Sequence, residues 1–308
     1  MKAPPPKPLP APPLSAAGTA GDRPVSHSSV LTGAVAEPLT EPTPRPGTDQ
    51  ERGDRCLLTG LRGNIAVAGV KGGEGRTTLA LLLGSALAGL YGGGVVALDV
   101  APHGGTLAHR AGSPRYAASV LDLLGQPRPT GPRSLWRVPG GLVVVGGDRR
   151  ISQQTLTVGG YRALRRQLAD RYPIVITDTA AGLVDPITTV VLARADLLVI
   201  PMSTRSDSAA MAGAAMDQVL ARGHGALLKR SVVVVNAIRP GDPGIAPQRI
   251  AEQLQPIVQA VVCVPWDPHL AGGTAIDIRR LAAPTMQAYQ SLAHVIARSM
   301  PGSQTGAA

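Results

Sequence analysis

The chain has 308 residues and a formal net charge of +10, which allows one large domain or two small ones and favours an acidic partner such as a nucleic acid, an anionic lipid surface or an acidic protein. An arginine-rich genomic bias would give the same charge, so the charge alone does not identify the class of partner. The two cysteines, Cys56 and Cys263, lie far apart in sequence and exclude a disulfide framework or a cysteine-based metal cluster, which favours the reducing cytoplasm.

The first 60 residues differ in composition from the rest. Residues 1–46 hold twelve of the 29 prolines and lack a periodic apolar pattern. Such a segment cannot bury enough surface to offset its chain entropy, so we expect 1–60 to be a disordered tail with polyproline-II character. The tail would be either a docking segment for a proline-binding protein or a spacer. No apolar run follows Lys2, so a secretory signal is not expected.

Beyond the tail, apolar β-branched runs alternate with longer amphipathic stretches, which predicts an α/β domain over 61–300 and a flexible end over 301–308. The strands are expected to form a doubly wound, mostly parallel sheet with helices on both faces. The predicted strands are Asn64–Val70, Val95–Asp99, Leu142–Val145, Ile174–Asp178, Leu197–Pro201, Val232–Asn236 and Ala260–Val264. The predicted helices are Thr77–Leu90, Ala117–Leu124, Gly160–Arg171, Ser206–Arg222, Pro247–Gln255 and Pro284–Ser299.

One apolar stretch has a second interpretation. Residues 77–98 carry no charge and are as long as the roughly 20 residues that cross a bilayer. Three consecutive glycines, Gly92 to Gly94, interrupt the stretch. We therefore favour a buried helix, a turn and a buried strand over a membrane span.

A glycine-rich segment joins the first predicted strand to the first predicted helix. Glycine lets the backbone turn tightly and approach an anion, and the N–H groups at a helix start then cradle phosphate. A threonine hydroxyl at the start of the helix is a common Mg²⁺ ligand. The predicted phosphate-binding residues are Lys71, Gly72, Gly73, Glu74, Gly75, Arg76, Thr77 and Thr78.

This segment resembles the deviant Walker A loop of the ParA/MinD family of ATPases, which begins with an early lysine. The strict P-loop pattern would instead need glycine at Val70 and lysine at Arg76. The resemblance implies ATP and Mg²⁺ as cofactors. It also implies a homodimer in which Lys71 reaches the nucleotide of the partner. Arg76 departs from the family motif, and a glycine-rich turn without function is the alternative.

Two predicted strands end in an aspartate. The resemblance places Asp99 near the Mg²⁺ shell, as a catalytic residue together with Lys71. It makes Asp178 the Walker B carboxylate that binds Mg²⁺ through water, beside Thr77. Ala101 stands where the family has the aspartate that orients the attacking water. Aspartates also end strands without any such role, and this remains the alternative.

A cation of different shape at position 76 and a missing carboxylate at position 101 together predict slow or absent ATP hydrolysis. Arg76 is a planar fork rather than a compact ammonium, and the methyl group of Ala101 cannot position water. Asp148 and Asp185 are candidates for a replacement carboxylate.

Two later segments resemble the part of the family site that holds the base. Asn236 ends a strand at the place where the family has a polar residue that reads adenine. Pro265, Trp266 and Asp267 resemble the loop that lines the adenine. Trp266 could instead be an ordinary core residue.

The resemblance implies a nucleotide-gated switch that dimerises on ATP and positions a partner in DNA partitioning, cell division or secretion. A proline-rich extension also resembles the MinD-like ATPases of actinobacterial type VII secretion, with a protein partner bound through the tail. Arg279-Arg280 and Lys229-Arg230 would contact DNA non-specifically. MinD-type membrane binding is not expected, because no basic amphipathic helix follows Pro301. A non-catalytic scaffold with the same fold is the alternative.

Overall fold

A computed structural model describes most of the chain from residue 61 onward. The described residues are 61–101, 105–114, 117–125, 135–147 and 155–300. The predicted tail over 1–60 and the predicted flexible end over 301–308 lie outside them.

One sheet organises the described residues. It holds eight strands in the order β3-β4-β2-β5-β1-β6-β7-β8, and all neighbours pair in parallel except β3 with β4. The bounds are β1 (Gly63–Gly69), β2 (Val95–Asp99), β3 (Trp136–Arg137), β4 (Val143–Val145), β5 (Ile174–Ala181), β6 (Leu197–Ser203), β7 (Val232–Asn236) and β8 (Ala260–Val264). The predicted doubly wound, mostly parallel sheet is therefore confirmed.

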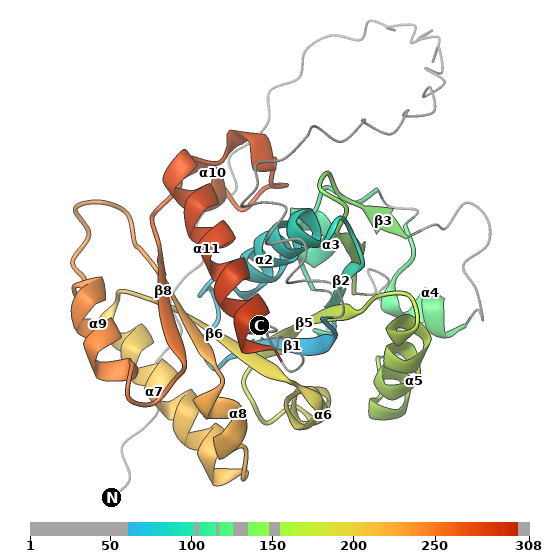
Figure 1. Cartoon of the computed structure of the whole chain (residues 1–308), viewed down its shortest axis with the longest axis horizontal. Coiled ribbons are helices and arrows are strands. Elements are labelled where there is room, and N and C mark those ends of the chain that lie inside the picture. Colours follow the sequence, from blue (N-terminus) through green and yellow to red (C-terminus); the bar gives the residue numbers. More distant parts are fainter. Residues whose placement is uncertain (1–60, 102–104, 115–116, 126–134, 148–154, 301–308) are drawn as a thin grey trace, which may run out of the picture. The chain divides into compact units, whose positions relative to one another are not determined.

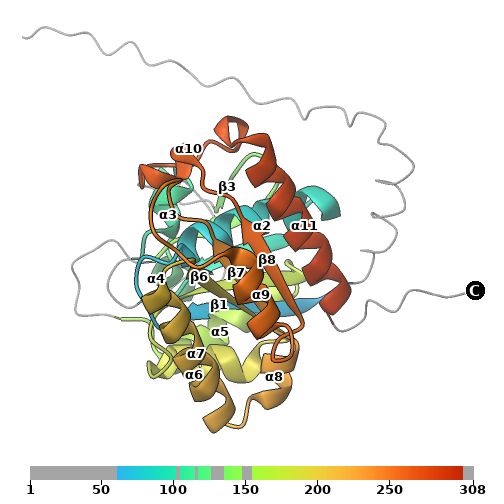
Figure 2. The same ribbon diagram turned by 90° about the vertical axis from the view of Figure 1, so that its left-hand side faces the viewer.

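Helices cover both faces, as the continuous apolar strands require. Their bounds are α2 (Arg76–Tyr91), α3 (Leu107–Arg110), α4 (Val120–Leu124), α5 (Val158–Ala169), α6 (Pro186–Arg194), α7 (Ser206–Ala221), α8 (Gly225–Lys229), α9 (Pro247–Leu254), α10 (Pro268–Ala271), the 3₁₀ turn η1 (Ile278–Arg280) and α11 (Ala283–Ser299). The side chains of α2, α3 and α11 join one core, and those of α4 to α9 join the other. Figure 2 shows α2 and α11 on one side of the sheet and α6, α7 and α8 on the other.

The central strand β1 shows why two cores form. Ile65 and Val67 point into the core of α2 and α11, whereas Ala66 and Ala68 point into the opposite core. All four side chains are buried, as expected for a strand covered on both faces.

The first long helix ends where the glycines stand. Gly92, Gly93 and Gly94 have φ values of 69°, 119° and 73°, in the left-handed region that favours glycine. The chain then reverses into β2. None of the helices in the described part of the chain is long and apolar enough to cross a membrane.

The structure adds elements that the sequence did not predict. The helix α6 begins at Pro186 and is capped by Asp185, whose Oδ1 accepts from Ile187 N at 2.9 Å. The predicted helix from Ala117 begins only at Val120, because Ser119 and Asp122 form a capping box there. The short elements β3, α3, α8, α10 and η1 were also missed.

Candidate nucleotide-binding site

The glycine-rich loop lies between β1 and α2, at the carboxyl edge of the sheet. Gly73 and Gly75 have φ values of 82° and 85°, so a side chain at either position would strain the backbone. Gly75 precedes the first residue of α2, and a Cβ there would lie 3.2 Å from Nδ2 of Asn236. The loop thus presents bare backbone at a helix start, which is the arrangement that binds phosphate.

Arg76 is folded onto the loop. Its guanidinium NH1 donates to the carbonyl oxygens of Lys71 at 2.7 Å and Gly69 at 3.3 Å. Its Nε is buried without a partner among the described residues. Burial lowers the pKa of Arg76, and the charges of Asp178 and Glu74 oppose that shift. The departure from the family motif therefore keeps a positive charge at the loop and ties the loop's carbonyls together.

Lys71 turns toward its own chain. Its Nζ lies 2.7 Å from Oδ2 of Asp207, in the first turn of α7, and 3.3 Å from Oε1 of Glu74. The hydrogen bond to Asp207 is the largest cause that raises the pKa of Lys71. The lysine that the resemblance assigns to a partner's nucleotide is held here by carboxylates of the same chain.

Thr77 and Asp178 meet beneath the loop. Oγ1 of Thr77 donates to Oδ2 of Asp178 at 2.7 Å, while Oδ1 of Asp178 is buried without a hydrogen-bond partner among the described residues. Burial raises the pKa of Asp178 to about 7, and the charge of neighbouring Asp99 adds to the shift. The hydrogen bond from Thr77 and the charge of Arg76 oppose this shift but do not cancel it.

Asp99 lies next to Asp178, since the two residues pair across β2 and β5. It is fully buried, and its carboxylate accepts from Ala101 N and from Leu107 N, both at 3.1 Å. A Cβ at Gly105 would collide with this carboxylate, so the backbone approaches it closely. Burial raises the pKa of Asp99, and these backbone hydrogen bonds oppose the shift.

The oxygen ligands of Thr77, Asp178 and Asp99 fit Mg²⁺. A protein usually binds Mg²⁺ through one or two carboxylates and leaves the other positions to water and substrate phosphates. The described residues hold no group of three or more His, Cys, Asp or Glu side chains that would form an all-protein cage. The unpartnered oxygen of Asp178 gives such an ion an available ligand.

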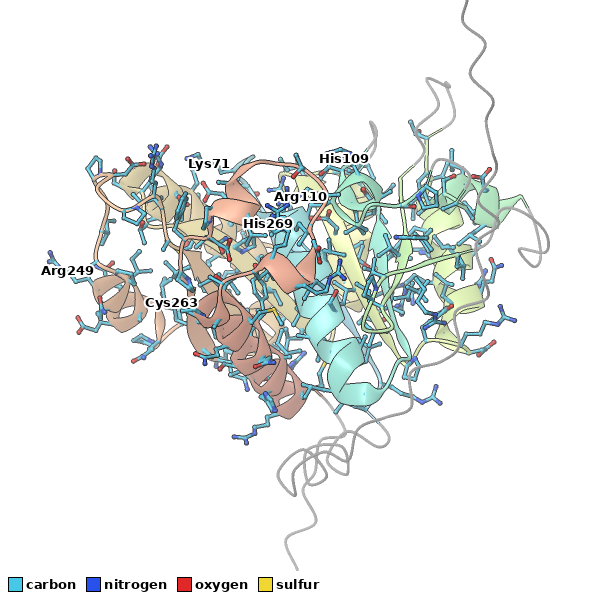
Figure 3. All side chains as sticks on the ribbon, turned by 90° about the horizontal axis from the view of Figure 1, so that it is seen from above. Lys71, His109, Arg110, Arg249, Cys263 and His269 are labelled. Carbon is cyan, nitrogen blue, oxygen red and sulfur yellow. The ribbon has the colours of Figure 1, made fainter. Side chains whose placement is uncertain are left out.

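A cavity of about 750 Å³ brings the predicted residues together. The loop forms one wall, α3 and the end of β7 form others, and the segment from Pro265 to Ala271 closes it. Figure 3 shows Lys71, His109, Arg110 and His269 in this part of the molecule, with Arg249 away from it at the left. The lining includes residues 71–78, Asn236, Pro265, Trp266 and Asp267, whereas Asp99 and Asp178 lie behind Thr77 and outside the lining.

Two of the predicted base-binding side chains are engaged with the protein. Nδ2 of Asn236 donates to the carbonyl oxygen of Glu74 at 2.9 Å and so holds the loop. The carboxylate of Asp267 accepts from His269 N and Ala282 N, both at 2.9 Å, and caps α10. Trp266 is half-buried and lines the cavity.

Arg110 is a site residue that the sequence did not reveal. It is buried, and its guanidinium donates to the carbonyl oxygens of Thr274 at 2.7 Å and Leu270 at 3.2 Å and to Oγ1 of Thr78 at 3.1 Å. It therefore joins the loop to the segment that closes the cavity. It stands on the four-residue helix α3, where no periodic pattern marks it.

The remaining predictions concern the replacement carboxylates and the arginines expected to contact DNA. Asp185 is the N-cap of α6, so its carboxylate already accepts from backbone N–H groups. Asp148 lies outside the described residues. Arg279 pairs with Asp277 at 3.0 Å, and Nε of Arg230 donates to the carbonyl oxygen of Asp196 at 3.2 Å, so both arginines have partners in the chain.

Solved structures of MinD and ParA ATPases share this fold. A ParA family ATPase from Chlorobium tepidum matches with a TM-score of 0.62 and 16% identity, over 76% of this chain and 98% of that chain. MinD from Pyrococcus horikoshii, solved with Mg-ADP, matches with a TM-score of 0.58 and 18% identity, over 74% of this chain and 93% of that chain. The chain thus has the fold of the MinD and ParA ATPases, as its motifs predicted.

One curated relative is a secretion-associated protein. The ESX-1 secretion-associated protein EspI of Mycobacterium tuberculosis is 32% identical over 228 residues. The match covers 70% of this chain, and the chain spans about a third of the length of that relative. The predicted resemblance to secretion-linked MinD-like proteins is confirmed. A scan against family models finds no match.

Proposed function

We propose that this chain is a Mg-ATP-binding switch of the ParA/MinD type that dimerises on nucleotide and positions or regulates a partner in the cytoplasm. The hydrogen bond of 2.7 Å between Thr77 and Asp178 carries the proposal, because it lies directly beneath the glycine loop. The loop's N–H groups and Arg76 would hold the phosphates. Thr77 and Asp178, with Asp99 behind them, would hold Mg²⁺, which neutralises phosphate charge when bound.

The proposed dimer requires Lys71 to leave its own chain. In the single chain, Lys71 contacts Asp207 and Glu74. A phosphate of the partner's nucleotide would replace these carboxylates, so dimerisation and release of Lys71 are coupled. Since an exposed ion pair contributes little to stability, its loss is a small cost.

Sedimentation velocity of the full chain with a non-hydrolysable ATP analogue tests this step. We expect wild type to dimerise with the analogue and Lys71→Ala to stay monomeric. Lys229→Ala, which removes an exposed lysine far along the chain, is the matched control and should dimerise. Normal dimerisation of Lys71→Ala would refute the proposed role of Lys71.

Slow hydrolysis is the second part of the proposal. Ala101 offers no carboxylate for the attacking water, and Asp185 is engaged as a helix cap. We expect Ala101→Asp to raise ATP turnover above the wild-type rate. Rapid wild-type turnover that the substitution leaves unchanged would contradict the proposed defect.

The position of Arg76 favours one alternative. Its contacts with the carbonyls of Gly69 and Lys71 stabilise the loop without nucleotide, as a non-catalytic scaffold would need. Calorimetry with Mg-ATP separates the two functions, because a scaffold that binds no nucleotide would release no heat.

The partner is proposed to be a secretion component, since the curated relative is secretion-associated. Retention of DNA by the full chain, with no secretion component bound, would favour partitioning instead.

A further inference from the structure

A second cavity lies on the far side of the sheet from α2. It has a volume of about 260 Å³ and lies beside the amino ends of β1 and β6, whereas the glycine loop lies at the carboxyl edge. Four arginines line it, three from α5 and one from the end of α6. The lining residues are Asn64, Arg162, Arg165, Arg166, Ala169 and Arg194.

The spacing on α5 gathers the charges. Positions 162, 165, 166 and 169 follow the i, i+3, i+4, i+7 pattern of one helix face, so Arg162, Arg165 and Arg166 project together. Like charges four residues apart, as in Arg162 and Arg166, destabilise a helix. Nothing in the core packing of α5, which uses Tyr161, Leu164 and Leu168, requires three arginines here.

These arginines have no ion-pair or hydrogen-bond partner among the described residues. Nε and NH1 of Arg165 are enclosed and unpaired, although buried guanidinium groups normally find acceptors. Burial lowers the pKa of Arg165, Tyr161 and Asp196 oppose that shift, and the charge of Arg194 adds to it. The negative charge of an anion bound in the cavity would raise the pKa of Arg165 and so oppose this shift.

The nearby negative charge does not neutralise the cluster. Asp196 acts on Arg165, but Oδ2 of Asp196 already accepts from Asn64 N at 2.8 Å and from Asn64 Nδ2 at 3.2 Å. Asp170 is the exposed C-cap of α5. The C-terminal ends of α5 and α6 add roughly half a negative charge each. Two carboxylates and two helix ends leave a positive excess against four arginines.

We propose that the arginines of α5 and α6 form an anion site that binds a phosphate group, separate from the glycine loop. A planar guanidinium group can donate two parallel hydrogen bonds to phosphate oxygens. Arg165 is half-buried and could hold the phosphate from below, while exposed arginines surround it: Arg162, Arg166 and Arg194. The small cavity favours a free phosphate or diphosphate group as the source. A nucleic-acid backbone presents the same chemistry.

Calorimetry of the full chain with inorganic pyrophosphate tests the site. The variant Arg162→Gln/Arg166→Gln changes only exposed side chains. The control Arg239→Gln/Arg249→Gln removes the same charge from exposed arginines, and Arg249 stands on α9, which lies on the opposite side of the molecule from α5 (Figure 1). We expect pyrophosphate affinity to fall at least about tenfold in the first variant and to stay near wild type in the control.

A second arm identifies the source of the phosphate. Fluorescence anisotropy with a mixed-sequence single-stranded oligonucleotide follows binding to the same proteins over a range of salt concentrations. Selective loss of oligonucleotide binding in the first variant, with weak pyrophosphate binding throughout, supports a phosphate site that uses a nucleic-acid backbone. Equal binding of both probes by the first variant and the control would overturn the proposal.

Discussion

The cationic side chains at the glycine loop and those around the second cavity differ in whether they have oxygen partners in the chain. At the glycine loop, Lys71, Arg76 and Arg110 each contact identified oxygen atoms of the same chain. Around the second cavity, the arginines of α5 and α6 make no hydrogen bond or ion pair with the described residues. Figure 1 shows these two helices in the lower part of the molecule. Paired cations set the shape of a site in advance, and unpaired cations leave a site that an anion must complete.

The largest expected effect concerns Asp178. Its pKa is raised to about 7 in the fold, against about 4 in the unfolded chain. Between these values the folded state binds more protons than the unfolded state, so the free energy of unfolding falls as pH rises. We expect Mg²⁺-free protein to lose a few kcal/mol between about pH 4 and pH 7. Denaturant unfolding at several pH values measures this.

Asp178→Asn removes the charge and should flatten that profile, with a gain in stability at pH 7. Asp217→Asn, at an exposed carboxylate of α7, is the control and should keep the wild-type slope. A profile in Asp178→Asn as steep as that of wild type would show that burial of this carboxylate is not the cause.

Removal of a paired cation is the next effect in size. Arg110→Gln removes the hydrogen bonds to the partly buried carbonyl oxygens of Thr274 and Leu270, and each such bond contributes about 0.5–1.5 kcal/mol. The thermal midpoint should fall. Arg137→Gln removes an exposed donor to Gly141 and should change it little. Equal loss in both variants would contradict the bridging role of Arg110.

Release of Lys71 should have a smaller effect. Asp207→Asn breaks an exposed ion pair, so the free energy of unfolding should stay unchanged. If the pair holds Lys71 away from a partner, dimerisation with an ATP analogue should strengthen by less than about fivefold. Sedimentation velocity across protein concentrations measures the dimer constant, and weaker dimerisation would count against the coupling.

Removal of the unpaired arginines of α5 should have the smallest effect on stability, and this effect should be a gain. Arg162→Gln/Arg166→Gln removes a like-charge pair on α5 and should stabilise the free protein by about 0.2–0.5 kcal/mol. Urea unfolding at low salt can resolve this gain. A clear loss of stability would mean that these arginines have structural partners.

The fold and the loop could be predicted because their signals are local. Continuous β-branched runs such as Val232–Asn236 mark buried parallel strands, and Gly73 and Gly75 mark the turn between strand and helix. The bridge made by Arg110 could not be predicted, because it joins α3 to residues about 160 positions away. The helix α6 was missed because its apolar run is short and begins with proline, which also occurs in turns.

The binding of Mg-ATP to the full chain tests the central claim most directly. Isothermal titration calorimetry should show one nucleotide per chain and a strong dependence on Mg²⁺. Thr77→Val keeps the shape of the side chain but removes the hydroxyl that contacts Asp178, and it should weaken Mg-ATP binding by about 10- to 100-fold. Unchanged affinity in Thr77→Val, or equal affinity with and without Mg²⁺, would contradict the account.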